Sequence, residues 1–308
     1  MKKFPILLII AFVAVTAITV TYRAKHGCQN NCNINYPNYS QPTEAPNRIV
    51  SLAPNLTEIL FAMGLDEKIV AVSNGSDAPA KALTKAKVGS FWQPDIEAII
   101  AAKPDLVITL WFEQQKNIAE TLERLGYKVL TLKIEKINEL TEAIKLIGRA
   151  TNAQQQAQQL ARDLTDQLNQ LQTKFNKADK TKVLWVVQTQ PLRLAGRDTF
   201  VNQLIELAGG VNAIGPTIQQ YPQTDTEQLT GCGAQVIIHS SMGTENVAQQ
   251  QQQAELFWKD KINLPSVNNN RIHVIDSDMV LRLGPRLPQG IEMIARFLHP
   301  DIFTNKND

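Results

Sequence analysis

Aromatic residues gather at two places in a chain that is otherwise poor in them. Only 6% of the residues are aromatic, yet Phe91 is followed directly by Trp92, and Trp111 by Phe112. Flat apolar side chains of this kind suit the face of a large planar or conjugated ligand. The alternative is that two of these four rings pack into a hydrophobic core, where we expect Trp185, inside a predicted strand, to lie.

The other residues that could carry chemistry do not form a catalytic or metal-binding pattern. Of the four His, only His239 lies near a loop after a predicted strand, whereas a zinc or manganese site needs several His and carboxylates. Ser240 and Ser241 lack the Gly-x-Ser-x-Gly elbow of many hydrolases. Residues 53–55, Ala-Pro-Asn, stand where a Gly-rich phosphate loop would follow the first strand. We therefore expect no enzyme, no metal site and no cofactor.

The composition is that of an ordinary folded protein. The 308 residues are 44% hydrophobic and 19% charged, with a net charge of +2, and this length gives room for two domains. The chain contains no stripe of Lys and Arg, which a dedicated nucleic-acid binder would need. We therefore expect no nucleic-acid partner.

An internal repeat organises the chain. Residues 95–108 are echoed by residues 225–238 at a constant offset of 130. Each copy begins with an acidic helix cap, Asp95 or Asp225, continues as a short helix and ends in a strand of branched apolar residues. Two similar α/β halves usually enclose a cleft, and clefts between lobes are where ligands bind.

Strands and helices alternate along both halves. In the first half we expect strands at 48–52, 69–72, 87–89, 106–110 and 128–132. We also expect three helices there: one capped by Asn55 and ended by Gly64, one at 97–102 and one at 117–125. In the second half we expect strands at 182–187, 236–239 and 271–275, and helices at 200–207, within the repeat and at 287–298. This alternation predicts parallel sheets with helices on both faces.

A long amphipathic stretch separates the two halves. From Ala153 to Phe175 apolar residues recur at steps of three and four, and no Gly or Pro interrupts residues 149–180. This pattern predicts a single rigid helix between the lobes, although a coiled-coil dimer is a competing interpretation. The expected fold is α/β, with two parallel-sheet lobes at 47–147 and 181–308 joined by one long interlobe helix at 148–180.

The N-terminus carries the features of an exported protein. Two Lys precede an apolar run at 4–20, which is typical of a signal peptide or an N-terminal membrane anchor over residues 1–22. Residues 23–46 predict a flexible tether, and Cys28 and Cys32 within it are close enough to pair in an oxidising compartment. We expect a periplasmic or otherwise extracytoplasmic protein, tethered to the membrane if the segment is retained.

Four segments together resemble one protein family. They are residues 48–58 (RIVSLAPNLTE), 88–97 (VGSFWQPDIE), 103–108 (KPDLVI) and 202–210 (NQLIELAGG). In this order and spacing they resemble the periplasmic substrate-binding proteins of ABC importers, in the vitamin B12, ferric-siderophore and haem class. The resemblance covers about residues 47–299. It implies two α/β lobes joined by one long helix, with little hinge bending, and a solute-capture protein without catalysis.

The resemblance also implies a partner, the permease dimer of an ABC importer. In such proteins a surface Glu on each lobe docks onto Arg residues of the permease, and the matching positions here are Glu97 and Glu227. Their equivalent places in the repeat suit a two-fold symmetric partner. The alternative is that they only stabilise helix N-termini, a task for which Asp95 and Asp225 are better placed.

The ligand of such a protein lies beyond the carboxyl ends of parallel strands. On that basis the predicted ligand-binding residues are Asn55, Asn74, Phe91, Trp92, Trp111, Phe112, Arg197, Ser241 and Arg282. The resemblance implies a cobalamin-like corrinoid, an iron siderophore or haem. Trp92 and Trp111 match positions that line the cleft of cobalamin-binding members, whereas Asn74 and Met279 stand where such members often carry aromatics, so the ligand stays open.

The arginines admit two interpretations. Arg193, Arg197 and Arg282 offer positive charge to ligand carboxylates or to an iron chelate. Arg282 and Arg286 could instead brace the lobe through Asp276 or Asp278. Two alternative functions also remain: a membrane-tethered ligand sensor, and a relative that binds zinc or manganese.

Overall fold

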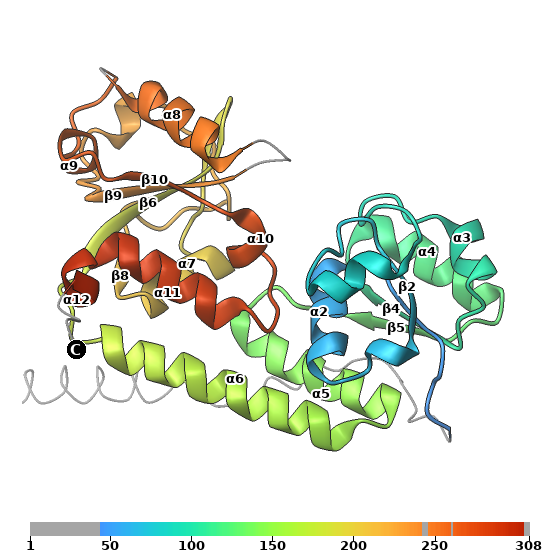
Figure 1. The fold of residues 1–308 in the computed structure, drawn as a ribbon. Helices are drawn as coiled ribbons and strands as arrows, with labels where there is room; N and C mark the ends of the chain where they lie inside the picture. The colour runs from blue at the N-terminus through green and yellow to red at the C-terminus, as the bar shows by residue number, and fades with distance from the viewer. Residues whose placement is uncertain (1–43, 242–245, 260, 305–308) are drawn as a thin grey trace, which may run out of the picture. The chain divides into compact units, whose positions relative to one another are not determined.

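The computed structural model describes residues 44–241, 246–259 and 261–304 (Figure 1). The predicted signal peptide or anchor, the pair Cys28 and Cys32, and nearly all of the predicted tether therefore lie outside the described residues. None of the described helices is both long and apolar enough to cross a membrane.

The first lobe is built on a sheet of parallel strands in the spatial order β3-β2-β1-β4-β5. The strands are β1 (Ile49–Ser51), β2 (Ile69–Val72), β3 (Ala86–Lys87), β4 (Leu106–Leu110) and β5 (Val129–Leu132). The helices and 3₁₀ turns between them are α2 (Pro54–Ala62), η1 (Asp66–Lys68), η2 (Ala80–Thr84), α3 (Ile96–Ala101) and α4 (Glu113–Arg124). The strand order reverses at β1, and in sheets of this kind ligands bind beyond the carboxyl ends of the strands at that point.

The second lobe repeats this topology. Its strands are β6 (Thr181–Thr189), β7 (Leu192–Leu194), β8 (Gly210–Asn212), β9 (Val236–Ser240) and β10 (Ile272–Ile275). The parallel order β8-β6-β9-β10 corresponds to β2-β1-β4-β5, and β7 pairs antiparallel with β6, which departs from the predicted all-parallel sheet. Its helices and turns are α7 (Phe200–Leu207), η3 (Glu227–Leu229), α8 (Val247–Trp258), α9 (Pro265–Asn268), α10 (Ser277–Val280), α11 (Leu287–Leu298) and α12 (Pro300–Thr304).

The repeat is visible in the backbone. Strands β4 and β9 begin at Leu106 and Val236, and the carboxylates of Asp95 and Asp225 accept the backbone N–H three residues later at 3.0 and 2.9 Å. The predicted helix of the second copy is wrong, because only the turn η3 forms there. The glycines at 231 and 233 make a continued helix costly, and Gly233 has a φ of +65°.

The long interlobe helix is shorter than predicted. Helix α6 (Gln154–Phe175) follows a separate helix α5 (Ile137–Thr151), and Asn152 between them is left-handed, with φ +55°. Asn tolerates this conformation better than other residues with a side chain. A Cβ on Gly148 would meet the Cβ of Ala157 at 2.4 Å, so the two helices approach closely at the turn. The apolar stripe of α6 packs on α5, α7 and α11 of its own chain (Figure 1).

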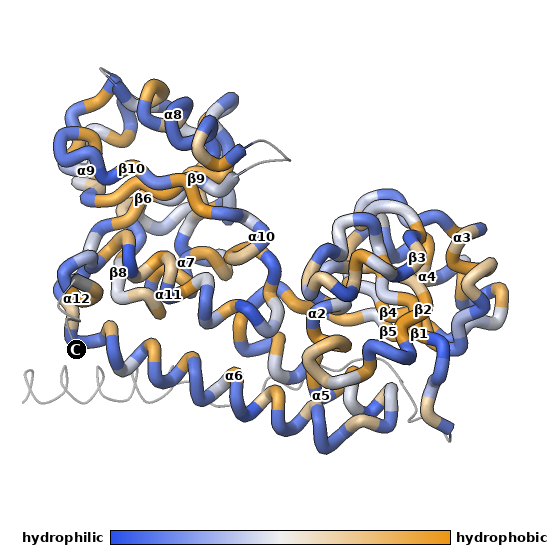
Figure 2. Tube along the Cα trace, in the orientation of Figure 1, coloured by the Kyte–Doolittle hydropathy of each residue, from blue (hydrophilic) through white to orange (hydrophobic). Residues whose placement is uncertain are grey.

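The α/β fold class, with two lobes and one long helix between them, is confirmed, and most predicted strands and helices form. Asn55 does not cap α2, because the helix begins at Pro54 with Ala53 as its cap. Hydrophobic residues concentrate in strands β1, β2 and β4 of the first lobe and β6, β9 and β10 of the second (Figure 2). Trp185 lies in this interior with no exposed surface, as predicted, and its indole N–H donates to the Ser240 hydroxyl at 2.8 Å.

Candidate functional site

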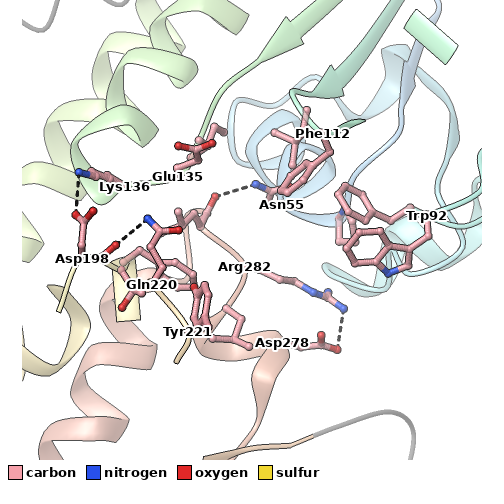
Figure 3. Close-up of a pocket in the computed structure, with 18 residues that line it drawn as sticks. Asn55, Trp92, Phe112, Glu135, Lys136, Asp198, Gln220, Tyr221, Asp278 and Arg282 are labelled. Carbon is pink, nitrogen blue, oxygen red and sulfur yellow. Dashed lines mark hydrogen bonds and ion pairs between the residues drawn. The ribbon is translucent and has the colours of Figure 1, made fainter. Parts of the chain in front are cut away.

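A cavity of about 570 Å³ lies between the two lobes (Figure 3). Its lining residues come from the carboxyl end of β4 and the residues that follow β1, β3, β4 and β5 in the first lobe, and from three separate segments in the second. They are Pro54, Asn55, Phe91, Trp92, Leu110, Phe112, Ile134, Glu135, Lys136, Asp198, Thr199, Phe200, Gln220, Tyr221, Asp278, Leu281, Arg282 and Leu283. The volume falls within the range of small-molecule binding sites.

A buried glutamine joins the first-lobe loops that form the cavity. The side-chain amide of Gln115 donates to the carbonyls of Leu52, at 3.3 Å, and Phe91, at 2.8 Å. Its own carbonyl accepts a hydrogen bond from the hydroxyl of Thr109. Because these partners lie in or beside three different loops, Gln115 fixes the loops relative to one another and leaves no polar atom of its side chain unpaired.

Three aromatic rings form one wall of the cavity. The ring centroid of Phe91 lies 4.8 Å from that of Trp92 and 5.4 Å from that of Phe112, in edge-to-face geometry. Trp92 is 61% exposed and Phe112 is 40% exposed. Exposed rings held in mutual contact offer apolar surface to a ligand. None of the four aromatics is buried, so the alternative that two of them pack into the core is wrong.

The opposite wall is mostly polar, with Phe200, Leu281 and Leu283 as its apolar members. Figure 3 shows Gln220 and Tyr221 on the side of the cavity across from Trp92 and Phe112, and Asp198 pointing to Lys136. The amide of Gln220 donates to the backbone carbonyl of Asp198 at 2.9 Å. Partial burial raises the pKa of the Tyr221 hydroxyl, which therefore stays protonated at neutral pH and can donate a hydrogen bond.

Charged groups connect the two lobes beside the cavity. The guanidinium of Arg286 binds both oxygens of the buried Glu58 carboxylate, at 2.6 and 2.8 Å. Arg282 contacts Asp77 at 2.6 Å and Asp278 at 2.7 Å. Although partial burial acts to raise the pKa of Asp77, the hydrogen bond and charge of Arg282 leave it below its ordinary value.

Both predicted interpretations of Arg282 therefore have a structural counterpart. It lines the cavity, and it also braces the second lobe through Asp278. Asp276 does not take part in this bracing, because its carboxylate accepts the backbone N–H of Asp278 and caps α10. The side-chain amide of Asn55 adds a further link between the lobes by donating to the carbonyl of Leu283 at 3.1 Å.

Five of the nine predicted ligand-binding residues meet at the cavity, namely Asn55, Phe91, Trp92, Phe112 and Arg282. The structure does not bring the other four to its lining. Trp111 is 55% exposed but lies outside it, and Asn74 is an exposed loop residue. Arg197 points to its own lobe, where it donates to the carbonyl of Ile214 at 2.8 Å, and the Ser241 hydroxyl accepts from the Ser277 N–H at 2.9 Å.

Some of the lining residues that sequence analysis missed do carry a signal in the sequence. Ile134 to Lys136 follow strand β5, so the rule that placed the other loops applies to them as well. Asp198 and Thr199 come just before α7, whose first residue is Phe200, as predicted. Gln220 and Tyr221 belong to an irregular segment, and nothing in its sequence pattern points to the cavity.

The two Glu residues predicted for docking lie at equivalent places. Glu97 and Glu227 are both exposed, and each follows by two residues an Asp whose carboxylate accepts a backbone N–H three residues later. Asp95 caps α3 as predicted, and the Asp225 carboxylate makes the corresponding hydrogen bond to the backbone N–H of Gln228 although only the turn η3 forms there. The carboxylates of Glu97 and Glu227 are therefore not needed for that task.

Metal-binding groups do not converge in the described residues. No cluster of three or more His, Cys, Asp and Glu side chains with the arrangement of a metal site occurs among them. His239 is buried in the second lobe, where its Nε2 accepts a hydrogen bond from the indole N–H of Trp258 at 2.7 Å. Its lone pair is thereby occupied.

Comparison with known proteins connects this geometry to a family. A substrate-binding lipoprotein of an ABC transporter in Bacillus subtilis is 29% identical over 265 residues, which cover 84% of this chain and 82% of the relative. The crystal structure of a periplasmic vitamin B12 binding protein of Vibrio cholerae is 26% identical, with a TM-score of 0.71, and the match covers 85% of this chain and 99% of that one.

A second solved structure shows that the fold alone does not specify the ligand. A periplasmic haem binding protein of Vibrio cholerae is 25% identical and has a TM-score of 0.72, over 82% of this chain and 99% of that one. The family model described as periplasmic binding protein matches residues 49–279, which is more than half of the sequence. The resemblance seen in the sequence motifs is confirmed, and the chain belongs to the periplasmic binding protein family.

Proposed function

We propose that this chain is an extracytoplasmic solute-binding protein that captures a large planar ligand and delivers it to an ABC importer permease. The ligand would be a cobalamin-like corrinoid or an iron chelate such as haem or a ferric siderophore. The observation that carries the proposal is the cavity itself, in which exposed aromatic rings face a polar wall. The relatives support it, because two of them are named for vitamin B12 and for haem.

The function we propose is capture without catalysis. The cavity combines apolar surface on one side with hydrogen-bonding groups on the other, which is the composition of a binding site. A reaction would need a nucleophile next to a base, or a metal centre. The described lining holds no His or Cys.

Native mass spectrometry and an absorbance spectrum of protein purified from its own cells test the ligand class. We expect a bound mass and an absorbance band of a corrinoid or haem, and the loss of both in a Trp92→Ala variant. Purified protein that binds zinc tightly but no macrocycle, or that turns over an ester, would contradict the proposal.

Delivery to a permease is the second part of the proposal. Glu97 and Glu227 are exposed and sit at equivalent places in the repeat, so they are suited to Arg residues on the two subunits of a symmetric permease. Replacing both by Ala should abolish ligand uptake by cells while ligand affinity stays unchanged. Replacing Glu120 and Asp166, exposed carboxylates on α4 and α6, is the matched control and should leave uptake intact. A loss of ligand affinity in the Glu97/Glu227 variant would count against docking.

The N-terminal segment supports the proposed location. Its two Lys and the apolar run at 4–20 suit export, and a relative is a lipoprotein. Deleting residues 2–22 should leave the protein in the cytoplasm, as cell fractionation would show. Export of the truncated chain would contradict the assignment.

A further inference from the structure

The cations that line the described cavity are already paired with carboxylates. Two lining residues are cationic, Lys136 and Arg282, and three are acidic, Glu135, Asp198 and Asp278. The formal charge of the lining is therefore −1, and Glu135 is itself paired with Lys133, outside the lining, at 3.1 Å. Lys136 lies 3.5 Å from the carboxylate of Asp198, so its charge is compensated within the lining.

Arg282 is surrounded by negative charge. Its guanidinium contacts Asp77 at 2.6 Å through Nη1 and Asp278 at 2.7 Å through Nη2, and Nη1 lies 3.7 Å from the Glu58 carboxylate. Because Arg286 neutralises Glu58, the Asp77 and Asp278 carboxylates together outweigh the charge of Arg282. The side chain that the sequence suggested for binding anions is therefore not free to do so.

An anionic ligand would meet electrostatic repulsion in this cavity. It would have to displace Asp77 or Asp278 from Arg282, or add a further negative charge beside them, and like charges brought together without compensation disfavour binding. An uncharged ligand meets no such cost. Amide groups on its periphery could instead donate hydrogen bonds to the carboxylates and accept one from the protonated hydroxyl of Tyr221.

The lining also offers little to an iron that needs a protein ligand. It contains no His, Cys or Met among the described residues. The phenol of Tyr221 is the one side chain there of a type that holds haem iron, and its burial disfavours the phenolate form. A macrocycle whose metal arrives with both axial positions filled does not need such a ligand.

We propose that the cavity selects an uncharged or cationic planar macrocycle with an amide-rich edge and disfavours anionic ones, and that Asp77 and Asp278 determine this specificity by occupying Arg282. The inference rests on the proposed function of the cavity as the ligand site. It goes further by choosing between the ligand classes that the fold leaves open.

Competitive binding of two probes tests the proposal. Cyanocobalamin carries no net charge and has an amide-rich edge, whereas haemin carries two propionates. Affinities are measured by isothermal titration calorimetry with the full exported chain. We expect cyanocobalamin to bind at least about tenfold more tightly, and the preference for it to fall by about tenfold when Asp77→Asn and Asp278→Asn are combined.

The control removes the same charge elsewhere. Asp66→Asn combined with Glu292→Gln breaks two ion pairs, with Lys81 and Arg296, outside the cavity lining, and should leave the ratio of the two affinities as in the unmodified protein. Circular dichroism checks that the variants fold. If the Asp77/Asp278 variant does not fold, the single Asp278→Asn change should shift the ratio in the same direction.

The outcomes separate this inference from the proposed function. One contrary result is that haemin binds the unmodified chain more tightly than cyanocobalamin does, with no increase in haemin affinity in the Asp77/Asp278 variant. That result would mean that an anionic ligand displaces Asp77 from Arg282, and the charge selection would be wrong. The proposed capture of a macrocycle would still stand. If neither probe binds, the proposed function is wrong and the inference falls with it.

Discussion

Asp105 and Gln235 make corresponding contacts with the backbone of the neighbouring strand, at equivalent places in the two lobes. The Asp105 carboxylate accepts the N–H groups of Asn47 and Arg48 at 2.9 Å each, and Oε1 of Gln235 accepts the N–H of Lys182 at 2.8 Å. In return, the N–H groups of Asp105 and Gln235 donate to the carbonyls of Arg48 and Lys182, at 3.0 and 2.8 Å. Each side chain thus ties the residue before β4 or β9 to the start of the neighbouring central strand, at Arg48 just before β1 and at Lys182, the second residue of β6.

Removing these side chains should destabilise the lobes unequally. Asp105→Ala loses two charge-assisted hydrogen bonds and should lower the free energy of unfolding by about 2 kcal/mol, whereas Gln235→Ala loses one neutral bond and should cost about 1 kcal/mol. Urea unfolding followed by circular dichroism measures both. Asp105→Asn, which keeps an acceptor, should fall between Asp105→Ala and the unmodified chain. If the two Ala variants lost equal stability, or Gln235→Ala lost more, the two side chains would be equivalent in geometry while their hydrogen bonds contributed differently from the expectation.

The sequence predicted the elements whose ends carry local signals. Strand 106–110 and helices 200–207 and 287–298 have the predicted bounds, because apolar periodicity and flanking Gly or Pro mark them. It failed at the turn between α5 and α6. Helix-forming residues continue on both sides of Asn152, and its left-handed backbone leaves no mark in a pattern of polarity.

The lining residues that follow strand ends could be predicted from the sequence, whereas those placed by tertiary packing could not. Asn55, Phe91 and Phe112 follow parallel strands, whose carboxyl ends meet at one edge. Arg197 was mispredicted although its neighbour Asp198 lines the cavity, since Arg197 bonds instead to the carbonyl of Ile214. Which of two adjacent residues faces a cavity is decided by tertiary contacts that the sequence does not display.

The pair of Glu58 and Arg286 should contribute to stability through contact between the lobes. Glu58 on α2 is only 5% exposed, and its carboxylate is bound at both oxygens by Arg286, just before α11. Glu58→Gln leaves a half-buried guanidinium without its counter-charge and should lower the free energy of unfolding by about 3 kcal/mol.

A double-mutant cycle separates the pair from its surroundings. With Arg286→Met as the second change, urea unfolding should give a coupling free energy of about 1–3 kcal/mol between the two residues. Additive effects would mean that other groups connect the lobes without this pair.

Ligand binding should depend on Trp92 and not on Trp111. Both indoles are largely exposed, so neither Ala variant should change the free energy of unfolding by more than about 0.5 kcal/mol. Trp92 contacts Phe91 and lines the cavity, whereas Trp111 does not. Of cyanocobalamin and haemin, the probe that binds more tightly is the one to measure. Its affinity should fall by about 10- to 100-fold in Trp92→Ala and by less than about threefold in Trp111→Ala. Equal losses in isothermal titration calorimetry would place Trp111 in the site, as the sequence suggested.

His239 should make the stability of the second lobe depend on pH. Burial lowers its pKa from 6.5 to about 4. The unfolded chain therefore takes up this proton at a higher pH than the folded chain. The stabilisation is complete above pH 6.5 and is lost as the pH falls towards 4, by up to about 3 kcal/mol.

A variant that cannot titrate isolates this contribution. His239→Gln keeps an acceptor for the indole N–H of Trp258 but binds no proton, so its free energy of unfolding should fall less steeply over that pH range than in the unmodified chain. Some slope should persist, because burial also lowers the pKa of His273 to about 4. Urea unfolding at a series of pH values measures both slopes. If they coincide, His239 is protonated in the folded protein as readily as in the unfolded chain, and its buried hydrogen bond with Trp258 does not hold it neutral.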